Sequence, residues 1–245
     1  MKRSTFLVIA GIFIVASGLM YLIHYLIFRD AHYIFLYLIG DLAFLPLEVF
    51  LVVIVIERFL SRREKQSQFQ KLNMVIGAFF SEVGNQLLGD LLPYIDNRGS
   101  IKHRLAVSMH WTSNDFKNAM SFTRSMAYEV NYQDIDMDAL KGFLIQRRQF
   151  LVRMLENPNL LEHDRFTDLL WAIFHLTEEL EVRPSLTNLP QKDLEHIAGD
   201  IRRAFSLLLI EWIYYVEHLK KNYPFLFSLV SRTHPFQDHP SPIVT

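Results

Sequence analysis

Two carboxylates, Asp41 and Glu48, lie seven residues apart in a segment that is otherwise apolar enough to cross a lipid bilayer. Ionisable side chains at membrane depth are costly, and they usually face a bundle interior, a partner helix or a water-filled path. At about 100° per residue, a helix places both acids on one face. With a rise of about 1.5 Å per residue, Asp41 lies roughly 10 Å and Glu48 roughly 21 Å from the outer boundary, so neither carboxylate reaches water easily.

Pro46 lies between the two acids. A proline inside a helix removes one backbone hydrogen bond, here leaving the carbonyl of Leu42 free, and it kinks the helix. Carboxylates and freed carbonyls are oxygen ligands that cations accept, and rings of acids select cations in channels. If several copies assemble with this face inward, Glu48 and Asp41 form two stacked rings. We therefore predict a cation- or proton-conducting path lined by Glu48 and Asp41, with Pro46 as a hinge.

A second interpretation keeps Asp41 within one chain. Ser17 and His24, in the preceding apolar segment, are expected at depths that bracket Asp41, and either side chain could be its hydrogen-bond partner in the hairpin. Asp41 would then be uncharged and structural. The neighbours expected for Glu48, Ala10 and Gly11, offer no polar side chain, so Glu48 is the stronger functional candidate.

The elements that position these residues are two apolar runs, residues 6–28 and 33–59, each long enough for a transmembrane helix. Only residues 29–32 separate them, so residues 1–60 should form an antiparallel hairpin. A cleaved signal peptide ending near Gly18 is the less favoured alternative, because apolar sequence continues beyond that point.

Basic residues flank both ends of the predicted hairpin on one side: Lys2, Arg3, Arg58, Arg62, Arg63 and Lys65. The positive-inside rule places that side in the cytoplasm. We therefore expect an integral protein of the cell or inner membrane with both termini cytoplasmic.

The remaining sequence predicts a cytosolic α-helical domain over residues 61–232 and a flexible C-terminal tail over residues 233–245. Apolar residues recur at three- and four-residue spacing, prolines punctuate the pattern, and no convincing period-2 alternation indicates a sheet. The expected helices are a continuation of the second span to about residue 92, two pieces within 100–130, and then 136–156, 162–182 and 190–222. The fold class is all-α: a two-helix transmembrane hairpin followed by a cytosolic helical bundle.

The last long helix carries one continuous apolar stripe, which predicts that this face lies in the core. From Leu207 to Tyr215 the helix is apolar nearly all round, so we expect it to be central in its bundle or shared with another subunit. The stripe consists of Leu194, Ile197, Ile201, Phe205, Leu208, Trp212, Tyr215 and Leu219.

Composition excludes several classes of function. Without cysteine there are no disulfides, thiolate metal sites or cysteine nucleophiles. The 25 basic and 26 acidic residues are balanced and dispersed, so we expect no nucleic-acid partner. The glycines at 84 and 89 have phosphate-loop spacing but lack the lysine that follows in that motif, and hydrolase and metalloprotease motifs are absent. We predict that the protein is not an enzyme and has no catalytic or cofactor-binding residues.

Two sets of acids and histidines invite a metal-binding interpretation. Asp168, His175 and Glu179 share one helix face, and the next helix carries Asp193, His196 and Asp200, with Glu211 and His218 further along. Spacing of three or four residues suits a metal site but equally describes solvated helix faces. The first set lies opposite the apolar face of its helix and should face solvent, and the second set describes a solvated face of a single helix. We therefore predict no metal site in either.

The leading hypothesis is therefore a membrane homo-oligomer with an acidic ion path. The alternative is a membrane-tethered cytosolic interaction or signalling module without transport activity. The expected partners are the lipid bilayer, other copies of the chain and a cytosolic protein.

Overall fold

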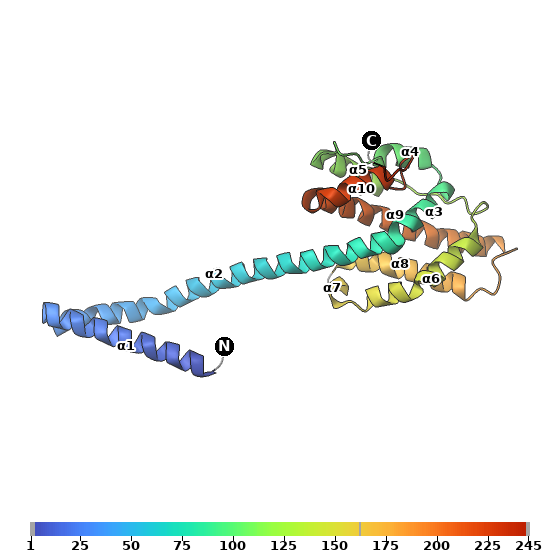
Figure 1. The fold of residues 1–245 in the computed structure, drawn as a ribbon. Coiled ribbons are helices and arrows are strands. Elements are labelled where there is room, and N and C mark those ends of the chain that lie inside the picture. Colours follow the sequence, from blue (N-terminus) through green and yellow to red (C-terminus); the bar gives the residue numbers. More distant parts are fainter. Residues whose placement is uncertain (1–2, 162, 244–245) are drawn as a thin grey trace. The chain divides into compact units, whose positions relative to one another are not determined.

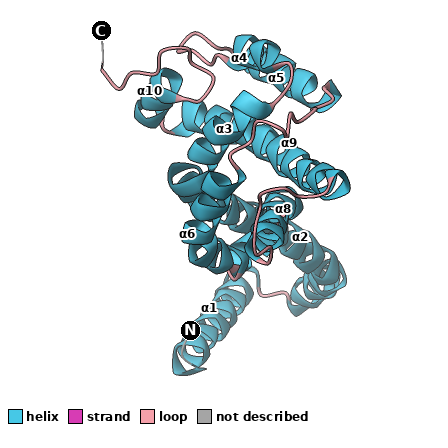
Figure 2. Cartoon of the chain, turned by 90° about the vertical axis from the view of Figure 1, so that its right-hand side faces the viewer, coloured by secondary structure: helices cyan, strands magenta, loops and turns pink. Residues whose placement is uncertain are grey.

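The structure, a computed structural model, describes residues 3–161 and 163–243, together with their side chains except those of residues 3–7, 10, 61–71, 159 and 161. Its compact units are Met1–Lys65, here called the hairpin unit, and Gln66–Thr245, here called the helical domain. The described elements are helices, and Figure 2 shows no strand among them. One isolated antiparallel bridge joins Ile95 to Val130. The all-α prediction is confirmed.

The hairpin unit consists of α1 (Arg3–Phe28) and the first part of α2 (Ala31–Phe79). A two-residue turn joins the helices: Arg29 adopts a left-handed φ of 48°, and the Asp30 carboxylate accepts a hydrogen bond of 2.9 Å from the backbone N–H of His32. Asp30 thereby caps the start of α2. Within this unit, α1 diverges from α2 as it leaves the turn (Figure 1).

Both helices of the hairpin unit have segments long and apolar enough to cross a membrane, Gly11–Phe28 and Ala31–Leu60. Large apolar side chains are exposed along both segments, including Phe13 at 73% and Ile39 at 67%. A continuous apolar surface of this extent needs a nonaqueous environment or a partner. The prediction of two N-terminal apolar helices is confirmed, and both helices start a few residues earlier than expected.

The helical domain begins within α2 and continues through a chain of shorter helices. The segments that follow α2 are a π-helical stretch (Phe80–Gly84), α3 (Asn85–Leu91), a 3-10 turn (Leu92–Tyr94), α4 (Arg98–Leu105), α5 (Ser113–Ser125), α6 (Met137–Leu155), α7 (Pro158–Leu161), α8 (Asp164–Glu181), α9 (Gln191–Asn222) and α10 (Pro224–Thr233). Several ends follow the local signals in the sequence. Thr112 and Asp115 form a capping box at α5, and Asp136 caps α6.

α9 is the central helix of the domain, in contact with α3, α5, α8 and α10 (Figure 1). Its apolar stripe is buried from Ile197 to Leu219, and Leu194 at its start is half-buried. Burial of about 25 cal/mol for each Å² of apolar surface makes such a stripe a main source of stability. The prediction that this helix is central is confirmed.

Gly84 ends the π-helical stretch in close contact with aromatic rings. A Cβ added there would lie 2.5 Å from Phe80 Cδ1 and 2.9 Å from Phe79 Cε1, and both phenylalanines are fully buried. At Gly77, seven residues earlier, an added Cβ would meet Tyr215 Cε2 at an ordinary 3.8 Å. The crowding at Gly84 therefore comes from rings of its own helical stretch, whereas Gly77 faces Tyr215 of α9 at an ordinary contact distance.

Gly84→Ala is expected to destabilise the domain by at least about 1 kcal/mol, because the buried rings have little room to move. Gly77→Ala is the matched control and should be neutral or stabilising, since alanine is the better helix former. Thermal unfolding followed by circular dichroism on the full chain in detergent measures both. Equal midpoints for the two variants would contradict the prediction.

The segment after α10 corrects the predicted start of the flexible tail at residue 233. His234 and Phe236 are 2% and 1% exposed, and the Phe236 ring packs edge-on against Trp212 with centroids 4.8 Å apart. The preceding segment is the ten-residue helix α10. The segment after α10 therefore packs back onto α9 through His234 and Phe236.

Candidate functional site

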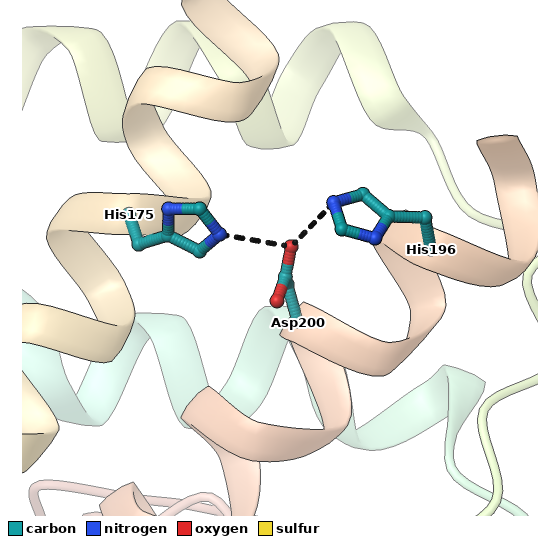
Figure 3. A group of neighbouring side chains, drawn as sticks. All are labelled: His175, His196 and Asp200. Carbon is teal, nitrogen blue, oxygen red and sulfur yellow. Dashed lines mark ion pairs between the residues drawn. The ribbon is translucent and has the colours of Figure 1, made fainter.

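Two histidines and two carboxylates meet where α8 packs on α9. Along α8, His175 and Glu179 are one turn apart, and along α9 His196 and Asp200 have the same four-residue spacing. Side chains four residues apart lie on one helix face. Because the two helices are consecutive and pack together, their faces meet, and Figure 3 shows both imidazoles pointing at the Asp200 carboxylate.

Asp200 is the centre of this group. Its Oδ2 atom lies 3.5 Å from His175 Nε2 and 3.5 Å from His196 Nε2. Its side chain is only 4% exposed, whereas those of His175 and His196 are 44% and 54% exposed. The other oxygen, Oδ1, lies 3.5 Å from a guanidinium nitrogen of Arg203. Among the described residues Oδ2 has no hydrogen-bond partner.

Glu179 lies beside the same two imidazoles. Its Oε1 atom is 3.9 Å from His175 Nε2, and its Oε2 atom is 3.7 Å from His196 Nε2. Arg183 donates to Oε2 at 2.7 Å and holds Asp193 through two hydrogen bonds of 3.0 and 2.7 Å. This guanidinium lowers the pKa of both carboxyl groups, mainly through its hydrogen bonds. Both acids therefore remain ionised beside the histidines.

Arg183, Glu179 and Asp193 form the outer part of the cluster, here called the clamp. A planar guanidinium that binds one carboxylate bidentately and a second through its remaining nitrogen leaves little rotamer freedom to the three side chains. The clamp joins the C-terminal end of α8 to the first turn of α9 and so sets the distance between His175 and His196. Ligand atoms of His175, His196 and Asp200 all lie within 4.8 Å of one another.

The structure therefore joins two sets that the sequence placed on separate helices. Of the first set, His175 and Glu179 enter the cluster, but Asp168 is exposed and takes no part. Of the second set, His196 and Asp200 lie at its centre and Asp193 in the clamp. The expectation that both sets face solvent is wrong for Asp200, which faces α8. The repeated four-residue spacing on two consecutive helices was the signal for this pairing.

Glu211, which lies further along α9, is outside this cluster and forms a separate ion pair with Arg165. Its side chain is 3% exposed and lies 3.5 Å from Arg165 Nε, and the Arg165 guanidinium covers the Tyr214 ring at 4.1 Å. Burial raises the pKa of Glu211, and the nearby arginines only partly offset it. This pair ties α8 to α9 at a second point and has a structural role.

The residues predicted for an ion path lie on α2 of the hairpin unit. Asp41 and Glu48 are both exposed, and Pro46 lies inside the helix between them. Among the described residues, no hydrogen bond joins Asp41 to Ser17 or His24. Ser17 is exposed, and the His24 ring lies against Phe28 of its own helix at 4.7 Å. The structure does not bring these proposed hairpin partners onto Asp41, because α1 and α2 diverge from the turn.

Together, the fold and its sites define a class of helical protein with an apolar N-terminal hairpin and a separate bundle. Residues 2–60 match the family model "MJ1433, N-terminal helical domain", and residues 68–232 match "Uncharacterized protein MJ1433, C-terminal helical domain". The chain belongs to this MJ1433 family.

A relative from Methanocaldococcus jannaschii, described as "Uncharacterized protein MJ1433", is 43% identical over 232 residues. That alignment covers 95% of this chain and 93% of the relative. No solved structure matches the chain.

Proposed function

We propose that the protein is an integral membrane protein that self-associates through the acidic face of its second span. The two apolar helices support membrane insertion, since each has a segment long enough to cross the hydrocarbon core. Basic residues at the start of the first run and the end of the second support an orientation with both termini in the cytoplasm.

The observation that carries the proposal is the exposure of both acids within a span. A carboxylate facing lipid is costly, and intramembrane acids normally face protein or water. One hairpin covers neither Asp41 nor Glu48, and no hydrogen bond in the described part of the chain pairs them with α1. Other copies of the chain are the simplest way to shield these two acids from lipid. The acidic face of each α2 then meets the acidic faces of the other copies around a symmetry axis.

In such an assembly Glu48 and Asp41 line a cation- or proton-conducting path. The two acids share a helix face, so each forms a ring, and acidic rings attract cations into a pore. Pro46 leaves a backbone carbonyl free between the rings, which adds oxygen ligands on the same path. A dimer of hairpins is too narrow for this path, so the proposal requires a higher oligomer.

Two measurements on the full chain test this function. Light scattering in detergent should give more than two copies per particle, and liposomes containing the protein should conduct cations or protons. Glu48→Gln should reduce flux at least about tenfold and Asp41→Asn by less, because removing a charge raises the barrier for a cation. Glu57→Gln, at the end of the second span, is the matched control and should conduct normally. A monomer or dimer, or flux unchanged in Glu48→Gln, would refute the ion path.

A membrane-tethered interaction module is the second candidate. It is favoured by the helical domain, which forms a unit of its own with its own buried core. In this role the hairpin only anchors the bundle for a cytosolic protein partner. A partner that copurifies with the full chain should still bind when residues 1–61 are replaced by an unrelated two-span anchor. Loss of that partner on the exchange would count against the module.

A further inference from the structure

The buried carboxylate of Asp200 forms ion pairs, but among the described residues its Oδ2 atom accepts no hydrogen bond. Its surroundings contain three nitrogen atoms at 3.5 Å, from His175, His196 and Arg203, and all three distances are too long for good hydrogen bonds. Buried charges in proteins are paired with hydrogen bonds or coordinate a metal ion. Here an oxygen with no hydrogen-bond partner among the described residues points between two imidazoles.

The spacing of these atoms fits a metal ion. Ligand atoms about 2.1 Å from a tetrahedral Zn²⁺ lie about 3.4 Å from one another. The separations between Asp200 Oδ2 and the two imidazole Nε2 atoms are both 3.5 Å, and all three ligand atoms lie within 4.8 Å of one another. The two half-exposed imidazoles therefore need only to approach each other to close on an ion. Both distances to Asp200 Oδ2 are also longer than those of good hydrogen bonds.

We propose that His175 and His196, through Nε2, and Asp200, through Oδ2, bind a divalent transition-metal ion of the Zn²⁺ type. Imidazole ligands favour Zn²⁺ and its neighbours over Ca²⁺ and Mg²⁺, which prefer oxygen ligands. Three protein ligands leave one tetrahedral position, and the half-exposed histidines leave that position accessible to water.

Glu179 is a positioning residue for this site. Arg183 holds one of its oxygens, and the other lies 3.9 Å from His175 Nε2. The carboxylate is therefore placed to accept a hydrogen bond from a water molecule on the metal ion. Hydrogen bonds of this kind orient ligands and raise metal affinity. The ion itself links α8 to α9, so its binding stabilises the packed pair of helices.

The test uses the full chain in detergent after removal of metal with a chelator. Titration with Zn²⁺ alone, followed by calorimetry, should show one saturable site for each chain, and Zn²⁺ should raise the midpoint of thermal unfolding. Co²⁺ in the same site should give the intense visible absorption of a tetrahedral complex. His196→Gln and Asp200→Asn should each weaken Zn²⁺ binding by more than about tenfold and abolish that absorption.

Control variants separate the site from general metal binding. His103→Gln, at an exposed histidine of α4, should bind Zn²⁺ like the wild type. His196 is itself half-exposed, so His196→Gln should fold even where Asp200→Asn does not. Absence of a saturable site in the wild type, or unchanged Zn²⁺ affinity in His196→Gln, would overturn the proposal. Neither outcome bears on ion flux through the hairpin, which is measured separately.

Discussion

Replacing Trp212 with alanine is expected to lower the free energy of unfolding by about 3–5 kcal/mol, the usual range for truncating a large buried aromatic side chain. Trp212 is fully buried in the middle of α9. Its indole N–H donates a 3.1 Å hydrogen bond to the Asn85 side chain of α3, and its ring contacts both His234 and Phe236. Truncation therefore removes contacts to two parts of the chain, α3 and the segment after α10, and leaves the Asn85 side chain without this donor.

Trp171→Ala is the matched control, because Trp171 is 55% exposed on α8 and packs edge-on against Phe174 alone among the aromatic rings of the described residues. It should cost less than about 1 kcal/mol. Urea titration of the full chain in detergent, followed by circular dichroism, compares the two. A similar loss in both variants would show that Trp212 does not hold the centre of the domain.

Stability is expected to fall as the pH drops from 7 to 5, because His234 takes up a proton in the unfolded chain while it stays neutral in the folded chain. His234 is 2% exposed, and burial lowers its pKa to about 4. Its Nδ1 accepts a hydrogen bond from the Phe236 backbone N–H, so its Nε2–H donates to the Val107 carbonyl at 3.1 Å. This arrangement requires the neutral imidazole.

The direction and size of the effect follow from linkage. The unfolded chain binds a proton near the ordinary histidine pKa of about 6.5 and the folded chain only near 4, so the stabilisation is complete above 6.5 and is lost towards 4. The loss between pH 7 and pH 5 amounts to about 2 kcal/mol. Other groups with shifted pKa values, such as His163 and His218, add to the total pH dependence.

A comparison with His234→Gln isolates this contribution. Glutamine cannot be protonated, so the variant should start less stable at pH 7 but lose less between pH 7 and pH 5. The exposed neighbour His239 gives the control, and His239→Gln should follow the wild-type pH profile. Unfolding midpoints of the wild type and both variants, measured from pH 7 to pH 5, test this prediction. Parallel curves for wild type and His234→Gln would contradict the prediction.

The sequence by itself determined the helices, because the signals for them are local. The uninterrupted apolar runs predicted α1 and the first part of α2, and the stripe from Ile197 to Leu219 predicted that α9 is buried and central. Caps and prolines placed most helix ends within a few residues. Each of these features depends on neighbours within one or two turns.

Only the tertiary structure decided which side chains meet. His175 and Asp200 form one cluster because α8 packs on α9. The spacing within each helix indicates which residues share a face, but not that the two faces meet. His234 and Phe236 are buried because the chain after α10 returns to Trp212, although its prolines resemble those of a tail. Ser17 and His24 were possible partners of Asp41 by depth alone, yet α1 and α2 diverge. Contacts between residues distant in sequence depend on how whole elements pack, which is a property of the complete fold.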